Sequence, residues 1–310
     1  MKKWQASLML ITVAMLWGAG FIATDESLKY LEPLQMQIFR FGIGAVILSL
    51  LFFKRLKNAS KRAIIYGIIL GFILFVAMSF QSFGLDNTTV PKNAFLTVTN
   101  VVWVPIILAF VLKIKPKAYL FYGTVVILIG FFFLLFDIDF LNLTTSFANL
   151  HQQMNINFGD FLSLVGGILF AVHIILCGRF VGKEDPITML IFQLVISTIF
   201  SMVLSFIFEG PFSSMGTNNF INALPALLFM AIFSSIIAFG MQLTAQKYLQ
   251  ASTAAILCSL ESLFAAIFAI IVGNVALTSS LIIAAIVITF GIIWAETGLK
   301  FQEKSELKVR

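Results

Sequence analysis

The chain has 310 residues, of which 60% are hydrophobic and only 11% are charged, and its mean hydropathy is +1.03. Soluble domains carry roughly 25% charged residues, so this composition excludes an ordinary soluble protein. The net charge of +6 does not indicate a nucleic-acid partner, because the Lys and Arg residues stand in short runs between apolar stretches.

A transmembrane helix needs about 20 mostly apolar residues to cross roughly 30 Å of hydrocarbon. The chain contains ten segments of about that length, and the first is too long for a signal peptide, so we interpret it as an uncleaved span. We therefore predict an all-α integral membrane protein with ten transmembrane helices. The predicted spans are 5–24, 35–53, 63–84, 93–112, 118–136, 159–179, 186–208, 222–246, 251–272 and 277–296.

The longest connection, residues 137–158, is polar and divides the spans into two groups of five. The predicted organisation is a first five-span unit at 1–136, an outer linker at 137–158, a second five-span unit at 159–296 and a tail at 297–310. Cys177 and Cys258 fall inside apolar segments, where they act as small hydrophobic residues. The sequence predicts no metal site and no cofactor.

Positively charged loops are retained on the cytoplasmic side of a membrane. If the N-terminus is inside, 17 of the 20 Lys and Arg residues fall in inner segments, and only Lys29 and Lys92 fall in outer loops. Arg40 lies within the second span. We predict a multi-pass protein of the inner or plasma membrane with both termini in the cytoplasm.

The two halves share a pattern of residues in their opening spans. Equivalent positions lie 153 residues apart: Trp17 with Phe170, Pro33 with Pro186 and Arg40 with Gln193. Because each half has an odd number of spans, the second copy must be inverted relative to the first. Two inverted five-helix repeats are typical of secondary transporters, in which the halves rock around a central site.

With this repeat, the chain resembles the drug/metabolite transporter superfamily, specifically its EamA-type members with two EamA domains. In the first half the resemblance rests on Trp17-Gly18 with Phe21, Pro33, Arg40, the string AFLTVTNVVWVP from Ala94 to Pro105, and Gly130. In the second half it rests on Gly159-Asp160, Gln246-Lys247-Tyr248 with Ala251, Ser259-Leu260-Glu261, and Gly291. The resemblance implies a secondary transporter that exports or takes up small metabolites such as amino acids, nucleosides or drugs and does not itself hydrolyse ATP. Of the two directions, we predict export.

The chain departs from the family pattern in the ninth span, where Glu261 is followed by Ser262 instead of the usual proline. Without that proline the sequence gives no reason to expect a kink in this helix. In the third span, Gly67 and Gly71 form a Gly-x-x-x-Gly pair, which we interpret as structural because it lets two helices approach closely.

Several polar side chains share faces of the predicted helices, and lipid cannot satisfy their hydrogen-bonding groups. We expect them to face protein or a water-filled cavity, as structural interhelical bonds or as a binding site. Trp17 and Trp103 lie inside spans, where either a cavity wall or core packing explains them. The predicted substrate site, near the bilayer midplane between the halves, consists of Trp17, Gln81, Asn100, Trp103, His173, Gln242 and Glu261.

Glu261 falls at the centre of the ninth span, where an ionised side chain costs at least ~2.5 kcal/mol, so the carboxyl must be neutral or paired. One interpretation is proton coupling, in which alternating access exposes Glu261 to two environments. The other is a permanent hydrogen bond or an ion pair with Arg40, Lys92 or Lys247. Arg40 could instead extend to the outer interface.

Two other classes of function stay open at this point. The first is an intramembrane lipid-modifying enzyme, which the sequence does not favour because it has no His-Glu-x-x-His, no Gly-x-Ser-x-Gly and no phosphate-binding glycine loop. The second is a channel or a structural membrane protein, against which the inverted repeat argues. The chain is therefore predicted not to be an enzyme, and its expected partners are a small-molecule substrate and the lipid bilayer.

Overall fold

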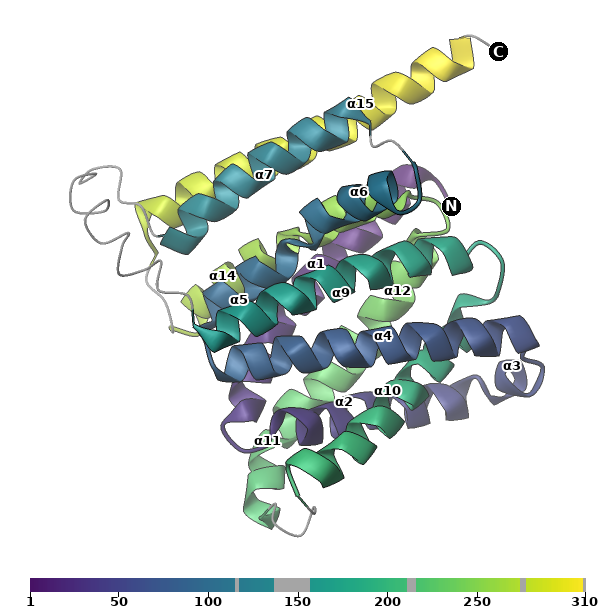
Figure 1. Cartoon of the computed structure of the whole chain (residues 1–310), viewed down its shortest axis with the longest axis vertical. Helices are drawn as coiled ribbons and strands as arrows, with labels where there is room; N and C mark the ends of the chain where they lie inside the picture. The colour runs from purple at the N-terminus through teal and green to yellow at the C-terminus, as the bar shows by residue number, and fades with distance from the viewer. Residues whose placement is uncertain (115–116, 137–156, 211–215, 274–276, 309–310) are drawn as a thin grey trace.

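The computed structural model describes residues 1–114, 117–136, 157–210, 216–273 and 277–308, and within these ranges the regular structure is helical, with no strand (Figure 1). Up to residue 136 the helices are α1 Lys3–Leu28, α2 Pro33–Leu51, α3 Phe53–Lys57, α4 Lys61–Asp86, α5 Val90–Val98, α6 Asn100–Phe110 and α7 Ala118–Phe136. After residue 156 they are α9 Phe158–Phe180, α10 Pro186–Phe208, α11 Thr217–Phe229, the π-helix η2 Met230–Ile237, α12 Ala238–Ala245, α13 Ala251–Cys258, α14 Leu260–Ile271 and α15 Ser279–Lys308.

The described residues contain eight helical segments that are long and apolar enough to cross a membrane. Three of these segments are composite, because α5 with α6, α11 with η2 and α12, and α13 with α14 each form one segment. Two shorter apolar stretches, Ala118–Phe133 and Ser279–Ala295, correspond to the fifth and tenth predicted spans. The prediction of an all-helical, multi-pass membrane protein is therefore confirmed.

The sequence also predicts an outer linker at 137–158 and a C-terminal tail at 297–310. The outer linker predicted at 137–158 lies outside the described residues except for its last two positions, and α9 already begins at Phe158. In the predicted tail, α15 continues as a helix through Lys308.

The fourth and ninth predicted spans are both interrupted near their middle. Between α5 and α6, the Thr99 hydroxyl donates a hydrogen bond to the Leu96 carbonyl oxygen at 2.6 Å. Between α13 and α14, the Ser259 hydroxyl donates to the Ile256 carbonyl oxygen, also at 2.6 Å. Such local hydroxyl bonds compete with the regular backbone ladder. The ninth span is thus broken without a proline.

Glycine residues allow the closest helix contacts. A Cβ atom on Gly67 would lie 2.8 Å from the Met189 carbonyl oxygen, and one on Gly71 would lie 2.6 Å from the Gln193 carbonyl oxygen. The structural interpretation of the Gly-x-x-x-Gly pair is confirmed, since it brings α4 onto α10. At one edge of the bundle, α7 and α15 pack along each other (Figure 1).

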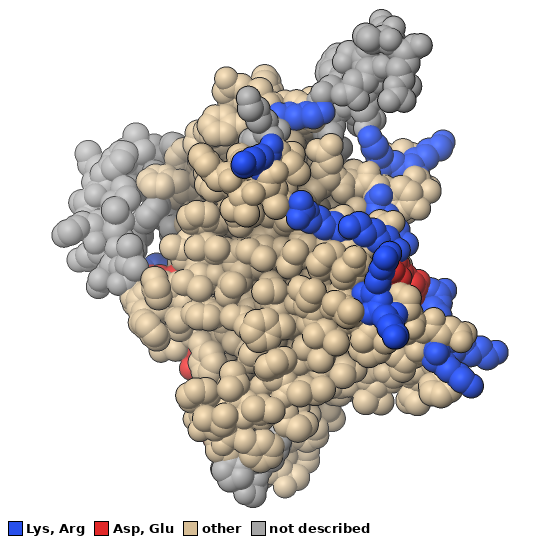
Figure 2. All heavy atoms as spheres, turned by 45° about the vertical axis from the view of Figure 1, so that its right-hand side comes forward, with Lys and Arg blue, Asp and Glu red and all other residues tan. Residues whose placement is uncertain are grey.

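The charged side chains are distributed unevenly along the bundle. Lys and Arg side chains gather at one end of the molecule, as Figure 2 shows. This is the end that carries α3, with Lys54, Arg55 and Lys57, and near which both chain termini lie (Figure 1). We call it the basic end.

Candidate functional site

A cavity lies inside the helix bundle, with walls contributed by both halves of the chain. The space that the centre of a water-sized sphere can occupy in it is about 40 Å³. On the same measure a single water molecule needs roughly 10–15 Å³. We call it the central cavity. Its lining residues are Trp17, Gly20, Phe21, Thr24, Arg40, Met78, Gln81, Leu85, Asn100, Phe170, His173, Ile174, Phe239, Gln242 and Glu261.

Six of the seven residues that the sequence suggests for the substrate site line this cavity, from helices far apart in the chain. The exception is Trp103, which packs against an apolar core formed mainly by α1, α7, α9, α13 and α15. Conversely, Arg40 lines the cavity although the sequence analysis did not assign it to the site. Its signal was present, because a cation inside a span is functional by default. That these residues bind a substrate stays a prediction.

Trp17 is held by the π-helical segment η2. Its indole Nε1 donates a hydrogen bond to the Ser234 carbonyl oxygen at 3.0 Å, and its ring lies 5.2 Å from that of Phe239. The close approach of α1 to η2 depends on Gly20, where a Cβ atom would lie 2.7 Å from the Ser234 hydroxyl oxygen. π-Helical turns are frequent at functional sites, and this one fixes the aromatic wall of the central cavity.

The same π-helical segment also positions Arg40 of α2. The Arg40 Nε atom donates a hydrogen bond to the Ser235 hydroxyl oxygen at 3.0 Å, and the residue is only 4% exposed. The suggestion that Arg40 extends to the outer interface is therefore wrong. A guanidinium has five N–H donors, and this is its single hydrogen bond within the described part of the chain. Its other donors are available to the central cavity.

Glu261 stands in the first turn of α14, immediately after the interruption at Ser259, and is 6% exposed. The alternative of a permanent hydrogen bond or ion pair is not seen, because among the described residues the Glu261 carboxyl has neither. Lys92 pairs with Asp160 at 3.4 Å, and Lys247 is exposed at the basic end. The central cavity thus contains one cation and one carboxyl that are not bonded to each other.

The buried amides divide into two groups. Asn93 and Gln246 are structural: the Asn93 Nδ2 atom donates to the Gln81 carbonyl oxygen, and the Gln246 Nε2 atom donates to the Ile174 carbonyl oxygen, both at 2.9 Å. The side-chain oxygens of these two amides are buried without a described hydrogen-bond partner, as are Asn100 Oδ1 and both polar side-chain atoms of Gln242, but only Asn100 and Gln242 line the central cavity. A buried polar atom without a partner is costly, so Asn100 and Gln242 are suited to bond a ligand in the cavity.

His173 completes the polar lining from α9. Its Nε2 atom lies 3.4 Å from the Gln193 Oε1 atom of α10, and the Cys177 sulfur lies 3.6 Å from the same nitrogen. The imidazole ring also lies 6.0 Å from the Phe239 ring, edge to face. Packing therefore fixes the position of His173 on three sides.

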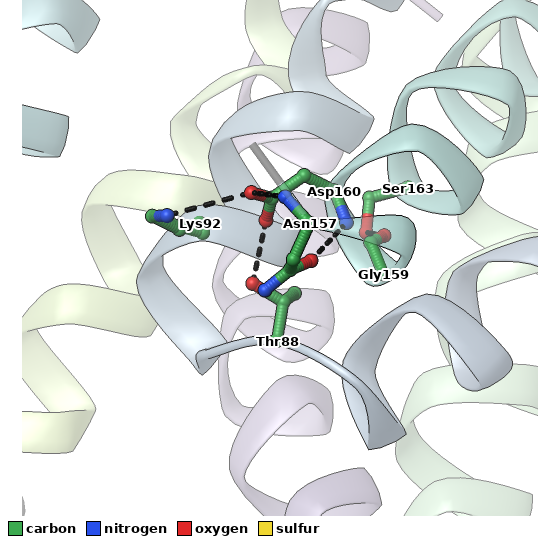
Figure 3. A network of polar contacts seen from close by, with 6 residues as sticks. All are labelled: Thr88, Lys92, Asn157, Gly159, Asp160 and Ser163. Atoms are coloured by element: carbon green, nitrogen blue, oxygen red, sulfur yellow. Dashed lines mark hydrogen bonds and ion pairs between the residues drawn. The ribbon is translucent and has the colours of Figure 1, made fainter. Parts of the chain in front are cut away.

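A polar network ties the halves together at the end of the bundle opposite the basic end (Figure 3). Asp160, at the start of α9, accepts hydrogen bonds from the Thr88 hydroxyl at 2.5 Å and from the Asn157 backbone N–H at 3.1 Å. It also pairs with Lys92 of α5. Asp160 therefore links the beginning of α9 to the connection between α4 and α5.

The sequence model of the EamA-like transporter family matches residues 4–136 and 157–297. A protein of Archaeoglobus fulgidus named "Uncharacterized transporter" is 30% identical over 274 residues, which cover 87% of this chain and 79% of that protein. The "Uncharacterized transporter YoaV" of Bacillus subtilis is 26% identical, over 91% of this chain and 94% of its own length. A solved crystal structure shares the fold with a TM-score of 0.74 at 16% identity, over 96% of this chain and 99% of that one.

Proposed function

Since the chain belongs to the EamA-like transporter family, we propose that it carries small zwitterionic metabolites, amino acids above all, across the cell membrane by alternating access around the central cavity. Family membership supports transport over the alternatives of an intramembrane enzyme or a channel, and the relatives are likewise named transporters. The substrate class rests on the chemistry of the cavity.

The observation that carries this proposal is the presence of Arg40 and Glu261 in one cavity without described ion-pair partners. A guanidinium presents paired N–H donors that match a carboxylate, and a carboxylate accepts hydrogen bonds from an ammonium group. An amino acid carries both complementary groups. The free amide atoms of Asn100 and Gln242 supply further hydrogen bonds, and Trp17 supplies an apolar wall.

Two features support ten spans arranged as inverted repeats. The fourth span of each half is interrupted, at Thr99 and at Ser259, and broken helices at the centre of the membrane are common in such transporters. The packing also has matching pairs: α1 packs on α12 as α9 packs on α4, and α1 packs on α14 as α9 packs on α6. Exchanging the halves converts each pair into the other. A cavity between such halves can open to either side in turn.

Glu261 gives a route to energy coupling. The substrate ammonium and a proton compete for the same carboxyl, so substrate binding releases a proton and substrate release allows the carboxyl to be protonated again. Where the proton gradient is directed into the cell, this exchange exports a substrate while a proton enters. The current cavity volume is small, so binding requires the halves to separate on one side.

Binding of matched ligands to the purified protein tests the substrate class. The panel contains an amino acid, the amine that lacks its carboxylate and the acid that lacks its ammonium group. We expect each analogue to bind at least about tenfold more weakly, because each loses one charge-assisted interaction worth about 1.5–3 kcal/mol. Equal binding of all three, or preferential binding of a nucleoside or an uncharged drug, rejects the zwitterion assignment.

Two substitutions test which charged group of the amino acid Arg40 binds and which Glu261 binds. In Arg40→Gln the amino acid should bind no better than the amine, and in Glu261→Gln it should bind no better than the acid. Arg55→Gln is the matched control, because Arg55 pairs with Asp185 at the basic end, outside the central cavity. For proton coupling, Glu261→Gln should fail to concentrate substrate under a pH gradient that drives the parent protein.

A further inference from the structure

A second, larger hollow lies at the basic end and plays no part in the proposed substrate site. Its volume is about 600 Å³, and it is bounded by the start of α1, the connection between α6 and α7, the end of α9 and the corner between α12 and α13. Four cationic side chains from these four regions line it, and among the described residues no Asp or Glu does: Lys3, Lys117, Arg179 and Lys247. We call this hollow the basic vestibule.

The vestibule is also lined by hydrogen-bond donors that have no partner in the described part of the chain. The N-cap residue of α13, Gln250, makes no side-chain capping bond, so the first backbone N–H groups of that helix stay open to the vestibule. Ser252 is 6% exposed and lines the vestibule, and its hydroxyl has no hydrogen bond within the described part of the chain. The open N-terminus of a helix favours an anion in addition to the cationic side chains.

The cations most suitable for a ligand are Arg179 and Lys247. Neither forms an ion pair with another described residue. Arg179 lies in the last turn of α9 and Lys247 in the connection after α12, so they line the vestibule from two different parts of the chain. Between them, the Gln246 side chain bonds to the Ile174 carbonyl oxygen, and Ile174 lines the central cavity while Ile175 lines the vestibule. The helix α9 therefore contributes neighbouring residues to both the vestibule and the central cavity.

We propose that the basic vestibule is a binding site for a phosphate group, held by Arg179, Lys247, the Ser252 hydroxyl and the N-terminal amides of α13. A phosphate carries several acceptor oxygens in different directions, which suits donors that converge from separate helices. The phosphate belongs either to the headgroup of an anionic lipid at this membrane surface or to a free anion in solution. Binding here does not depend on the identity of the transported substrate.

The test uses the full-length protein in phosphatidylcholine nanodiscs with two probes. One arm adds phosphatidylglycerol to the bilayer, and the other adds inorganic phosphate, compared with a chloride salt of equal ionic strength. Binding is measured from the rise of the thermal midpoint with probe concentration. The vestibule variant is Arg179→Gln with Lys247→Gln, and the matched control is Lys54→Gln with Lys57→Gln, which removes equal charge from α3 at the same end.

We expect the vestibule variant to bind its probe about 25-fold more weakly, because each of the two substitutions removes a direct hydrogen bond to the phosphate that is worth a factor of about five. The α3 control should stay within about twofold of the parent. A loss confined to phosphatidylglycerol identifies a lipid headgroup, and a loss confined to inorganic phosphate identifies a free anion. If the double variant does not fold, Lys247→Gln alone should lose about fivefold. Equal losses in both pairs, or no binding of either probe by the parent, overturn the site.

Discussion

At the scale of single residues, the two mid-span tryptophans show how the surroundings of a side chain decide its role. Both pack against the same apolar core, but Trp17 also bonds to the Ser234 carbonyl oxygen and lines the central cavity, whereas Trp103 does not line it. Hydropathy does not distinguish them, because both lie at mid-span. Only the position of the π-helical segment, which the sequence does not announce, separates a cavity wall from core packing.

We expect Trp17→Phe to weaken amino-acid binding about fivefold. The substitution keeps an aromatic ring but removes the indole N–H bond that fixes the ring against η2, and a hydrogen bond contributes about 1 kcal/mol. Trp103→Phe makes the same chemical change outside the cavity and should leave the affinity within about twofold. Equal effects of the two substitutions in a titration calorimeter contradict the assignment of Trp17.

Glu209, which follows α10, caps a different helix. Its carboxylate accepts hydrogen bonds from the backbone N–H groups of Leu34 at 2.7 Å and Gln35 at 3.0 Å, in the first turn of α2. Burial raises the pKa of Glu209 above its ordinary value of 4.5, and these hydrogen bonds offset part of the increase. The folded state therefore holds the Glu209 proton more tightly than the unfolded state does.

The resulting pH dependence has a definite sign. The contribution of Glu209 titration to stability is fully present below about pH 4.5 and is lost as the pH rises through the folded pKa. Glu209→Gln keeps an acceptor oxygen but does not titrate. We expect the thermal midpoint of the parent, minus that of Glu209→Gln, to fall as the pH rises from below 4.5 to neutrality. A difference that grows with pH contradicts this account.

At the scale of helices, the contact between α4 and α10 depends on the absence of a side chain at Gly71. A Cβ atom there would lie 2.6 Å from the Gln193 backbone oxygen, which cannot move without shifting its helix. We expect Gly71→Ala to destabilise the protein by about 1–3 kcal/mol, the usual cost of overpacking. The control is Gly182→Ala, where a Cβ atom meets nothing within 4 Å. Similar thermal midpoints for the two variants in detergent contradict the tight contact.

Hydropathy and span length predict most of the helices but not where they break. The apolar segments around α4 and α9 are continuous in the structure as in the sequence. The interruptions at Thr99 and Ser259 were not predicted, because each depends on a hydroxyl that bonds to a carbonyl three residues earlier, and most Ser and Thr residues in helices do not break them. The sequence led us to look for a proline, and Glu261 instead follows a serine-mediated break.

At the scale of the whole molecule, cavity residues were predictable as a set of polar groups that lipid cannot satisfy, but their individual roles were not. Helical spacing treats Asn93 and Asn100 alike, yet the Asn93 Nδ2 atom bonds within the bundle while Asn100 lines the central cavity. Arg40 was missed for a similar reason, since its depth depends on the neighbouring Ser235 of another helix. Such differences arise from packing between distant segments.

The distribution of charge predicts the orientation of the whole chain. Because Lys and Arg gather at the end near which both termini lie, we expect that end to face the cytoplasm (Figures 1 and 2). A reporter that is active only outside the cytoplasm should stay silent when fused after Arg310. Activity of that fusion in intact cells means that either the predicted orientation or the even number of spans is wrong.

The central claim is that this chain transports a zwitterion through the cavity that contains Arg40 and Glu261. The most direct test is counterflow in proteoliposomes that are loaded with an unlabelled amino acid and diluted into the labelled form. We predict that the parent protein and the Arg55→Gln control accumulate label transiently, and that folded Arg40→Gln does not. Accumulation by Arg40→Gln at the rate of the parent contradicts the claim.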